Sequence, residues 1–268
     1  MALHSMSSGF EWTDAAAPFR IINDEQAYSW NEDGYFLLKN VFEPALLSAV
    51  MEAIDPLEAK TNEFLRTVTD RRQYIARADE LTFALHVVLH SPEANKFARH
   101  PVFANLCLDL IGPDCRLYWD QAVYKKPGCP EEFPWHQDNG YNFVLPQDYL
   151  TCWVPLVDAT LDNGCPWILP GVHQSGPLEH WQTDLGWQCR EGNENAIPIE
   201  ASAGDVVVFS SLTPHRTGPN QTDKDRKAYI LQYCHDGSVL QPREGEPNQP
   251  QNHPDRQFLV TRQGQPVS

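Results

Sequence analysis

The chain has 268 residues, of which 41% are hydrophobic, and its formal net charge at neutral pH is −16. This hydrophobic content supports a sizeable core and is too high for a disordered chain. The acidic balance excludes nucleic acid and anionic membrane surfaces as the main partner, because both would repel the protein.

Features that would place the chain outside the cytoplasm are missing from the sequence. No run approaches the ~20 consecutive apolar residues of a membrane-spanning helix, and the first ten residues lack the basic, then apolar order of a secretory signal. The cysteines are odd in number and never spaced C-x-x-C, which favours free thiols over a disulfide framework. They are Cys107, Cys115, Cys129, Cys152, Cys165, Cys189 and Cys234. We therefore expect a cytoplasmic protein.

The N-terminal part is predicted to be mainly helical. Residues 1–20 show no period and are expected to be loosely attached to the rest. Downstream, helical patterns lie on either side of a short apolar strand at 34–38. Apolar residues at i, i+3 and i+4 spacing predict an amphipathic helix over 46–57. Two further helices are predicted at 80–89 and 101–111, the second ending at a Gly-Pro pair.

Beyond residue 114, short β-rich runs alternate with Pro, Gly, Asn and Asp. The predicted strands cover 116–124, 150–157, 167–169, 205–210 and 228–234. This pattern favours a sandwich or barrel. We therefore expect a mostly β protein with flanking helices, built on a double-stranded β-helix, or jelly roll. Residues 1–268 are expected to form one domain: a mainly helical layer at 1–113, the β-helix core at 114–240, and a C-terminal tail at 241–268 that forms loops over the core.

The sequence His136-Gln137-Asp138 is the strongest chemical signal in the β-rich part. On an extended strand, side chains two residues apart point to the same face, so His136 and Asp138 would face one ion and Gln137 would point away. His215 follows the apolar run Val206-Val207-Val208-Phe209 and would add a third ligand from a distant strand. Two imidazoles and one carboxylate hold a non-haem Fe(II) ion on one face and leave the opposite face open for substrate and O2.

Other histidines lack such a context. They are predicted to be surface or structural residues, and comprise His4, His86, His90, His100, His180 and His253.

Arg226, at the start of the last predicted strand, is a candidate anchor for a carboxylate. The planar guanidinium matches a carboxylate through two hydrogen bonds and stays charged. If the iron site uses a dicarboxylate co-substrate, one end would chelate the metal and the far carboxylate would need such an anchor. Thr217, in phase with His215, would add a hydroxyl to the same carboxylate. The alternative is a surface arginine within the charged run 223–227.

The chain resembles the phytanoyl-CoA dioxygenase family of Fe(II)/2-oxoglutarate oxygenases, from the Asp33-Gly34-Tyr35 segment to the strand near Cys234. The resemblance is most specific in FPWHQDNGY (Phe133–Tyr141), DATLDNGCPWILPGVHQSG (Asp158–Gly176) and AGDVVVFSSLTPHRTGPNQTDKDRKAYILQY (Ala203–Tyr233). It implies that His136, Asp138 and His215 bind iron and that Arg226 and Thr217 hold 2-oxoglutarate, with Trp153 and Gln121 beside the co-substrate. For Trp153, ordinary core packing is an equal alternative. His173, in Pro170-Gly171-Val172-His173, is expected to be structural.

The resemblance also bears on the reaction. Halogenating relatives lack the carboxylate ligand, so the presence of Asp138 implies hydroxylation or a related oxidation, with release of succinate and CO2. The sequence shows no basic cluster suited to the phosphates of coenzyme A, so family membership does not imply phytanoyl-CoA as substrate.

The residues that follow the motif are candidates for the wall of a small-molecule substrate site, although a plain surface loop would look the same. They are Asn139, Tyr141, Asn142 and Phe143. Two other functions stay open: a catalytically inactive metal-binding jelly roll, and a zinc hydrolase with the same ligand set. The second leaves Arg226 without a purpose and lacks an H-E-x-x-H helix. We expect a monomer or homodimer.

Overall fold

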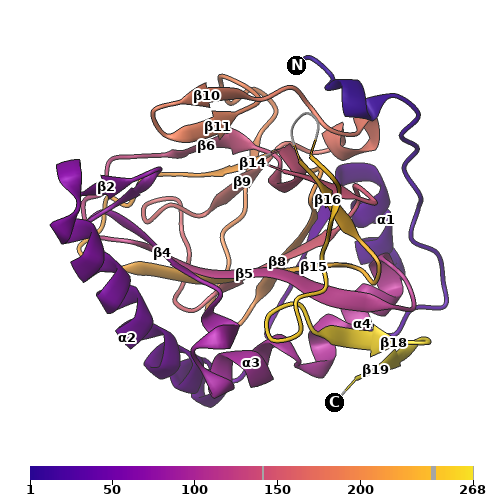
Figure 1. The fold of residues 1–268 in the computed structure, drawn as a ribbon, viewed down its shortest axis with the longest axis horizontal. Helices are drawn as coiled ribbons and strands as arrows, with labels where there is room; N and C mark the ends of the chain where they lie inside the picture. Colours follow the sequence, from indigo (N-terminus) through magenta and orange to yellow (C-terminus); the bar gives the residue numbers. More distant parts are fainter. Residues whose placement is uncertain (141, 243–245, 268) are drawn as a thin grey trace.

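Two antiparallel β-sheets face each other in the computed structural model, which describes residues 1–140, 142–242 and 246–267. The chain passes repeatedly between them: β5, β8, β13 and β15 lie in the larger sheet, whereas β6, β9 and β14, which come between them in sequence, lie in the smaller one. This alternation is that of a double-stranded β-helix (Figure 1). The expected fold class, mostly β with flanking helices, is confirmed.

The larger sheet carries most of the strand pairing. In spatial order it contains β1 (Tyr35–Leu38), β13 (Val206–Ser210), β8 (Leu150–Pro155), β15 (Arg226–His235), β5 (Cys115–Lys125), β4 (Leu81–Leu85), β3 (Ala76–Arg77) and β2 (Arg72–Gln73). At its side, β18 (Leu259–Arg262) pairs with β5 and with β19 (Gln265–Pro266). Five of the strands predicted from the sequence, at 34–38, 116–124, 150–157, 205–210 and 228–234, lie in this sheet with slightly different ends, and the sixth, at 167–169, lies in the smaller sheet.

The smaller sheet holds two of the three metal-ligand candidates. Its order is β12 (Ile197–Pro198), β9 (Pro166–Ile168), β14 (His215–Thr217) and β6 (Phe133–His136). Two minor groups complete the β structure: the hairpin β10 (Trp181–Thr183) and β11 (Gly186–Gln188), and the three strands β17 (Gln249–Pro250), β16 (Val239–Gln241) and β7 (Phe143–Leu145).

Helices cover the face of the larger sheet that points away from the smaller one (Figure 1). They are α2 (Pro44–Thr67), α3 (Pro92–Ala98) and α4 (Pro101–Leu110), whereas α1 (Asp24–Asp33) packs beside β1 at the end of the sheet. Their apolar sides and the outer face of the sheet share the main core, in which Ile54, Phe103 and Tyr229 are fully buried. In the described part of the chain, no helix combines the length and apolarity needed to cross a membrane.

A second apolar core lies between the two sheets, beside the metal-ligand candidates. Val123, Trp153, Phe209 and Ile230 from the larger sheet pack there with Ile168 from the smaller one. Because alternate residues of a strand point to opposite faces, β5, β8, β13 and β15 each supply side chains to both cores. The larger sheet therefore separates a helix-covered core from the interior that contains the site.

The predicted helix at 80–89 is wrong. Residues Leu81–Leu85 form β4 and pair with β5, and only a 3-10 turn, Val87–Leu89, follows. The apolar residues of this segment fit an extended as well as a helical pattern, and the hydrogen bonds that β5 offers select the strand. The helix predicted at 101–111 is confirmed as α4.

Both ends of the chain are more firmly attached than expected. In the N-terminal segment, Leu3 forms a β-bridge with Leu178, and Gln147 donates a 2.8 Å hydrogen bond to the Met6 carbonyl. In the C-terminal tail, Phe258 and Val260 are buried in the main core where β18 lies on β5. Hydrogen bonding to distant segments fixes both regions, and no local sequence pattern reveals it.

All seven cysteines are buried and free. This agrees with the expectation of thiols and no disulfide framework.

Candidate metal and co-substrate site

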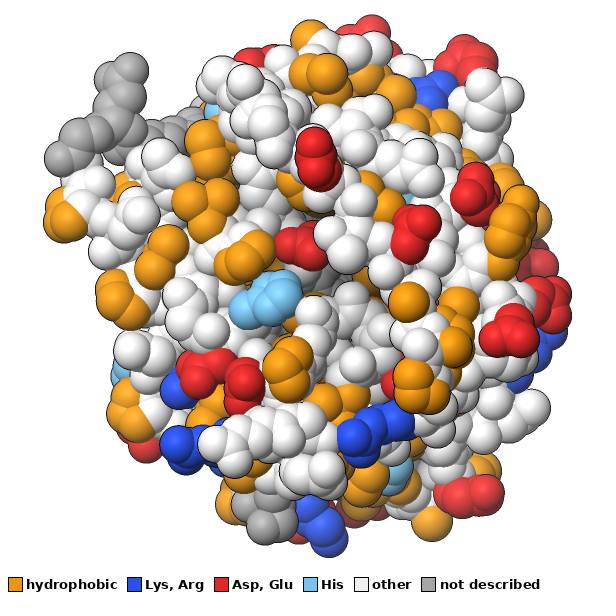
Figure 2. Space-filling model, turned by 90° about the vertical axis from the view of Figure 1, so that its right-hand side faces the viewer, with side chains coloured by type: hydrophobic (Ala, Val, Ile, Leu, Met, Phe, Trp, Pro, Cys, Tyr) orange, Lys and Arg blue, Asp and Glu red, His pale blue; other side chains and the backbone are white. Residues whose placement is uncertain are grey.

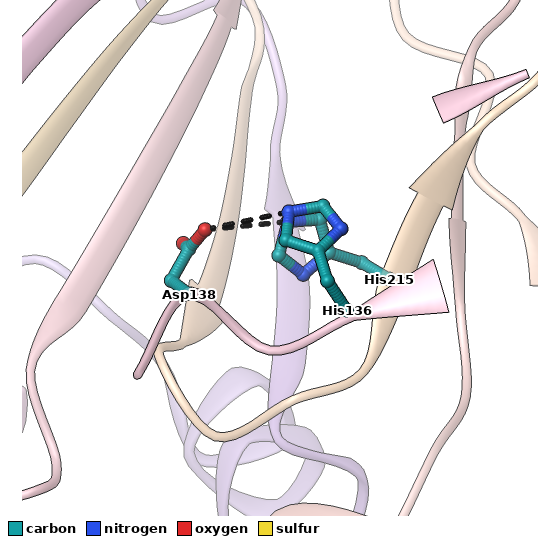
Figure 3. Close-up of side chains that lie close together, drawn as sticks. All are labelled: His136, Asp138 and His215. Atoms are coloured by element: carbon teal, nitrogen blue, oxygen red, sulfur yellow. Dashed lines mark ion pairs between the residues drawn. The ribbon is translucent and has the colours of Figure 1, made fainter. Parts of the chain in front are cut away.

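His136, Asp138 and His215 come together in the interior between the sheets (Figure 3). His136 ends β6, and His215 begins β14 as its direct cross-strand partner. Asp138 Oδ1 lies 3.7 Å from His136 Nε2 and 3.6 Å from His215 Nε2. One ligand atom from each residue lies within 4.8 Å of the others, which is compact enough for one metal ion to contact all three.

The secondary structure that places Asp138 beside the histidines differs from the expected one. His136 and Asp138 were expected on one strand, but β6 ends at His136 and Asp138 begins a 3-10 turn, Asp138–Gly140. The turn bends the backbone, and the carboxylate lies beside the two imidazoles and points toward them, as Figure 3 shows. The spacing of two residues thus places both side chains on one side through a strand end and a turn.

Both imidazoles are oriented by backbone carbonyls. His136 Nδ1 donates to the Pro134 carbonyl at 2.8 Å, and His215 Nδ1 donates to the Thr213 carbonyl at 3.0 Å. These bonds place the ring proton on Nδ1, so that the Nε2 lone pair faces the centre of the site. Burial, and then the nearby His215 ring, lower the pKa of His136 well below its usual value. A metal would therefore not have to displace a proton from His136.

Gln137 fixes the backbone of the motif through hydrogen bonds on the side away from the ligands. Its side chain is fully buried and points away from the ligands, as expected. Its amide nitrogen donates to the carbonyls of Gly176 and Leu212 at 3.1 and 2.6 Å, and its oxygen accepts from the Leu178 amide at 2.7 Å. The backbone N–H of Gln137 donates to His180 Nε2 at 3.0 Å. The central residue of the motif thus fixes the loop that carries Asp138.

Thr151 on β8 is a site residue that the sequence analysis missed. Its hydroxyl donates a 2.6 Å hydrogen bond to Asp138 Oδ2. Thr151 lies two positions before Trp153 on the same strand, and so shares its face. The spacing of two residues from Trp153 would identify Thr151 as a site residue once one face of β8 is known to point toward the site.

Arg226 lies at the start of β15 and is only 1% exposed. Its Nε and Nη1 are buried and have no hydrogen-bond partner among the described residues. The guanidinium carbon lies 5.5 Å from the centre of the Trp153 ring, within the range of a cation–π contact. Burial lowers the pKa of Arg226 to about 10. A buried guanidinium with unused donors is suited to a carboxylate supplied by a ligand.

Two more predicted co-substrate residues lie on strands around Arg226. Thr217 ends β14, and its hydroxyl accepts a 3.3 Å hydrogen bond from Lys125, the cross-strand partner of Arg226. Gln121 lies on β5 opposite Ile230, and its side-chain oxygen accepts from Trp119 Nε1 at 3.2 Å. Thr217 is therefore tied to the surroundings of Arg226, whereas Gln121 lies further along the same strand as Lys125.

The candidates for the substrate wall have different surroundings. Asn139 is fully buried, and its amide is used within the loop: it donates to the carbonyls of Val144 and Gln147 and accepts from the Val144 amide. It shapes the loop and has no group left for a substrate. Phe143 stacks on His4, with ring centres 4.4 Å apart. Tyr141 lies outside the described residues.

A cavity of about 760 Å³ lies beside this loop. It is lined by Gly140 and Phe143, by the N-terminal residues His4–Met6, and by His180 and Trp187. Figure 2 shows the side of the molecule that faces right in Figure 1, where hydrophobic, acidic and histidine side chains surround a hollow and most lysines and arginines lie toward the edge.

Comparison with known proteins shows which family the chain resembles. Residues 30–228 match the family model for phytanoyl-CoA dioxygenase (PhyH). A methylphosphonate hydroxylase from Gimesia maris is 26% identical over 229 residues, covering 79% of this chain and 80% of its own length. The non-heme alpha ketoglutarate dependent carbocyclase SnoK superposes with a TM-score of 0.73 at 22% identity, over 90% of this chain and 97% of its own. The epimerase SnoN, solved with Fe3+ and alpha ketoglutarate, gives a TM-score of 0.67 at 20% identity, with coverages of 88% and 97%.

The two structural similarities agree in fold, and the family match spans most of the chain, including every ligand candidate. The chain belongs to the phytanoyl-CoA dioxygenase family.

Proposed function

We propose that the protein is a non-haem Fe(II)/2-oxoglutarate-dependent dioxygenase that hydroxylates a small molecule and releases succinate and CO2. The observation that carries this proposal is one site with two parts: the compact cluster of His136, Asp138 and His215, and a buried Arg226 with unused donors. Neither part alone is specific. Together they match a metal that is shared with a chelating dicarboxylate. The whole chain, 1–268, is proposed as a single oxygenase domain.

The donor set fits a ferrous ion. His136 and His215 would supply neutral Nε2 atoms, and Asp138 would supply one charged oxygen, which leaves the opposite face of the ion open. When bound, the iron supplies the redox chemistry by which O2 and 2-oxoglutarate oxidise the substrate. The protein's own residues hold the reactants in place: the carbonyls of Pro134 and Thr213 orient the imidazoles, and Thr151 orients the carboxylate.

Arg226 and Thr217 would bind the far carboxylate of 2-oxoglutarate. The unused Nε and Nη1 hydrogens of Arg226 match the two oxygens of a carboxylate, and Trp153 packs against the guanidinium. Val123, Ile230 and Phe209 surround this region with apolar side chains. Their role would be to exclude water, which strengthens the charge interactions in the site.

The substrate is proposed to be a small molecule that approaches past Phe143 and the cavity beside it. The related proteins act on different molecules and carry out hydroxylation, ring formation or epimerisation, as their names state. Product analysis therefore has to decide between hydroxylation and these other outcomes. We further propose a cytoplasmic location, supported by seven buried free thiols, and a monomer or homodimer.

The two alternatives are less well supported. An inactive metal-binding jelly roll would have no reason to keep a buried arginine without a carboxylate partner, since an unpaired buried charge is costly. A zinc hydrolase also leaves Arg226 without a ligand. The family match supports neither alternative.

A binding experiment tests the proposal. Anaerobic addition of Fe(II) and 2-oxoglutarate should produce a visible charge-transfer band from the metal to the chelating 2-oxo acid. His136→Ala should abolish this band, whereas His90→Ala, at an exposed position, should leave it unchanged. A wild-type protein without the band, or a band that survives His136→Ala, would refute the iron site.

A further inference from the structure

Lys125 is a fully buried lysine beside the proposed co-substrate site. It ends β5, its exposed fraction is 0%, and it lies directly opposite Arg226 in the register of β5 and β15. Burying an ammonium group costs free energy unless its hydrogens find acceptors and its charge finds a partner. The contacts of Lys125 therefore indicate why a lysine stands here.

The three hydrogens of the ammonium group have three acceptors. Lys125 Nζ donates to the Glu131 carbonyl at 3.1 Å, to the Thr217 hydroxyl at 3.3 Å, and to the Gly218 carbonyl. Gly164 packs tightly against this corner, because a Cβ on it would overlap with the Gly218 backbone. The hydrogen bonds of Lys125 thus hold the end of β14, where Thr217 stands, against the end of β5.

The positive charge of Lys125 has no carboxylate partner among the described residues. The next two acidic side chains along the chain are engaged elsewhere: Glu131 with Arg77 at 2.5 Å, and Glu132 with Arg216 at 2.5 Å. Burial, and then the charge of Arg226, lower the pKa of Lys125 to about 7. An anion bound beside Lys125 and Arg226 would oppose this effect, because a nearby negative charge favours the protonated form of the lysine.

The hydrogen bond from Lys125 fixes the polarity of the Thr217 hydroxyl. When Lys125 is protonated, its ammonium group can only donate, so Thr217 Oγ1 accepts this bond. The hydroxyl hydrogen is then left to donate to another group. Arg226 Nε and Nη1 likewise lack acceptors in the described structure. A carboxylate is the ligand that accepts from a guanidinium and a hydroxyl together.

We propose that Lys125 is a positioning residue of the co-substrate site, which fixes the Thr217 hydroxyl as a donor to the far carboxylate of 2-oxoglutarate and makes the site selective for a dicarboxylate. This inference rests on the proposed function. It assigns Lys125 no direct contact with the ligand, since its three hydrogens are already used.

The test compares two 2-oxo acids on the Fe(II)-loaded protein without oxygen. 2-Oxoglutarate has the far carboxylate, and 2-oxobutyrate has the same chelating end without it. In Lys125→Met, 2-oxoglutarate should bind about ten- to a hundredfold more weakly, in the range of a lost hydrogen bond to a charged group. Binding of 2-oxobutyrate and of Fe(II) should not change, because neither uses the far-carboxylate site.

Substitutions of Thr217 show whether Lys125 acts through this residue. Thr217→Val should weaken 2-oxoglutarate binding to a similar extent, and Thr217→Ser, which keeps the hydroxyl, should restore it. In the double variant Lys125→Met with Thr217→Val, the two losses should not multiply. If Lys125→Met is too unstable to purify, the Val and Ser variants alone decide whether the hydroxyl donates to the far carboxylate.

Three results would overturn the inference: unchanged 2-oxoglutarate affinity in Lys125→Met or in Thr217→Val, equal losses for both 2-oxo acids, or losses that multiply in the double variant. Each of these leaves the proposed function intact, because the wild-type protein still forms the complex. If the wild-type protein binds no 2-oxoglutarate with Fe(II), the proposed function fails and this inference fails with it.

Discussion

The Thr151 hydroxyl donates a 2.6 Å hydrogen bond to Asp138 Oδ2. The other oxygen, Oδ1, lies 3.7 Å from His136 Nε2 and 3.6 Å from His215 Nε2. Because one oxygen is engaged by Thr151, a metal would be bound through Oδ1 alone. A single oxygen occupies one coordination position and leaves the opposite face of the ion open.

Thr151→Val should therefore weaken Fe(II) binding. The substitution keeps the shape of the side chain and removes the hydroxyl, so Asp138 can rotate and its buried Oδ2 loses its partner. The expected loss of Fe(II) affinity is about 10- to 100-fold, the range for residues that orient a metal ligand. Thr151→Ser is the matched control and should restore affinity, because it retains the donor. Equal affinities for the wild-type protein and Thr151→Val would show that this bond does not orient Asp138.

Gly140→Ala should destabilise the loop that carries Asp138. A Cβ at this position would overlap with the His180 ring, which cannot move freely because it accepts from the Gln137 N–H and bonds to the Leu178 carbonyl at 2.9 Å. We expect a loss of about 1–3 kcal/mol in the free energy of unfolding, as for other overpacked sites, measured by denaturant unfolding.

Two variants check this steric explanation. Gly218→Ala should cost less, because its Cβ would meet its nearest neighbours at 3.6 and 3.8 Å, which are ordinary contacts. Adding His180→Ala to Gly140→Ala should recover part of the lost stability, because it makes room for the new methyl group. If His180→Ala lowers stability by the same amount in both backgrounds, the overlap is not the cause.

The three metal-ligand candidates named from the sequence lie close together in the structure, and there is a physical reason for this. The chemistry of the metal limits the ligands to few residue types, and the spacing in His136-Gln137-Asp138 places two of them on one side. That spacing tolerates an error in local structure: Asp138 lies in a turn and not on the strand, yet its carboxylate still faces the histidines. The third candidate, His215, is identified by the buried strand before it.

The supporting residues could not be predicted in the same way. Lys125 contacts Thr217 because β5 pairs with β15 and ends beside β14. The residues near Lys125 in the sequence do not reveal this pairing. The segment Leu81–Leu85 illustrates the same limit, since its apolar residues fit a helix until β5 offers a partner. Residues whose role depends on contacts between distant strands therefore emerge only from the fold.

Asp120 should make the protein less stable at neutral pH than at mildly acidic pH. Burial raises the pKa of Asp120 from 3.8 to about 6, although the Val88 N–H and the Tyr229 hydroxyl both donate to its Oδ2. Its Oδ1 has no hydrogen-bond partner among the residues that the structure describes, and it lies 4.0 Å from His86 Nδ1. Burial also lowers the pKa of His86 to about 4, so this imidazole is neutral when Asp120 ionises and provides no ion pair.

The direction of this pH effect on stability follows from the ionisation of Asp120 in the unfolded and folded states. The unfolded chain ionises Asp120 above pH ~4, whereas the folded protein resists ionisation until about pH 6. The penalty is thus absent below pH ~4, grows between pH ~4 and ~6, and then stays near 3 kcal/mol. Asp120→Asn should raise the melting temperature at pH 8 much more than at pH 4.5. A shift that is the same at both pH values would exclude ionisation of Asp120 as the cause.

Arg226→Met should stabilise the protein in the absence of metal and co-substrate, while abolishing its response to 2-oxoglutarate. The guanidinium is buried with two unused donors, and the adjacent Lys125 adds repulsion. Replacing an unpaired buried charge with an apolar side chain of similar volume is expected to stabilise by about 1–4 kcal/mol. The loss of the Trp153 contact offsets part of this gain. Thermal unfolding without ligands should therefore show a higher melting temperature for the variant.

Arg216→Met provides the matched control for this prediction. Arg216 is also buried, and its Nε likewise has no hydrogen-bond partner among the described residues. Unlike Arg226, it has a carboxylate beside it: its Nη1 lies 2.5 Å from Glu132 Oε2, and its guanidinium lies over the Trp167 ring at 4.8 Å. Its charge thus has partners within the protein, and its removal should lower the melting temperature. With Fe(II) present and oxygen excluded, 2-oxoglutarate should raise the melting temperature of the wild-type protein and of Arg216→Met, but not of Arg226→Met. If both substitutions destabilise the ligand-free protein equally, Arg226 stabilises the fold. Its burial would then need no ligand carboxylate as an explanation.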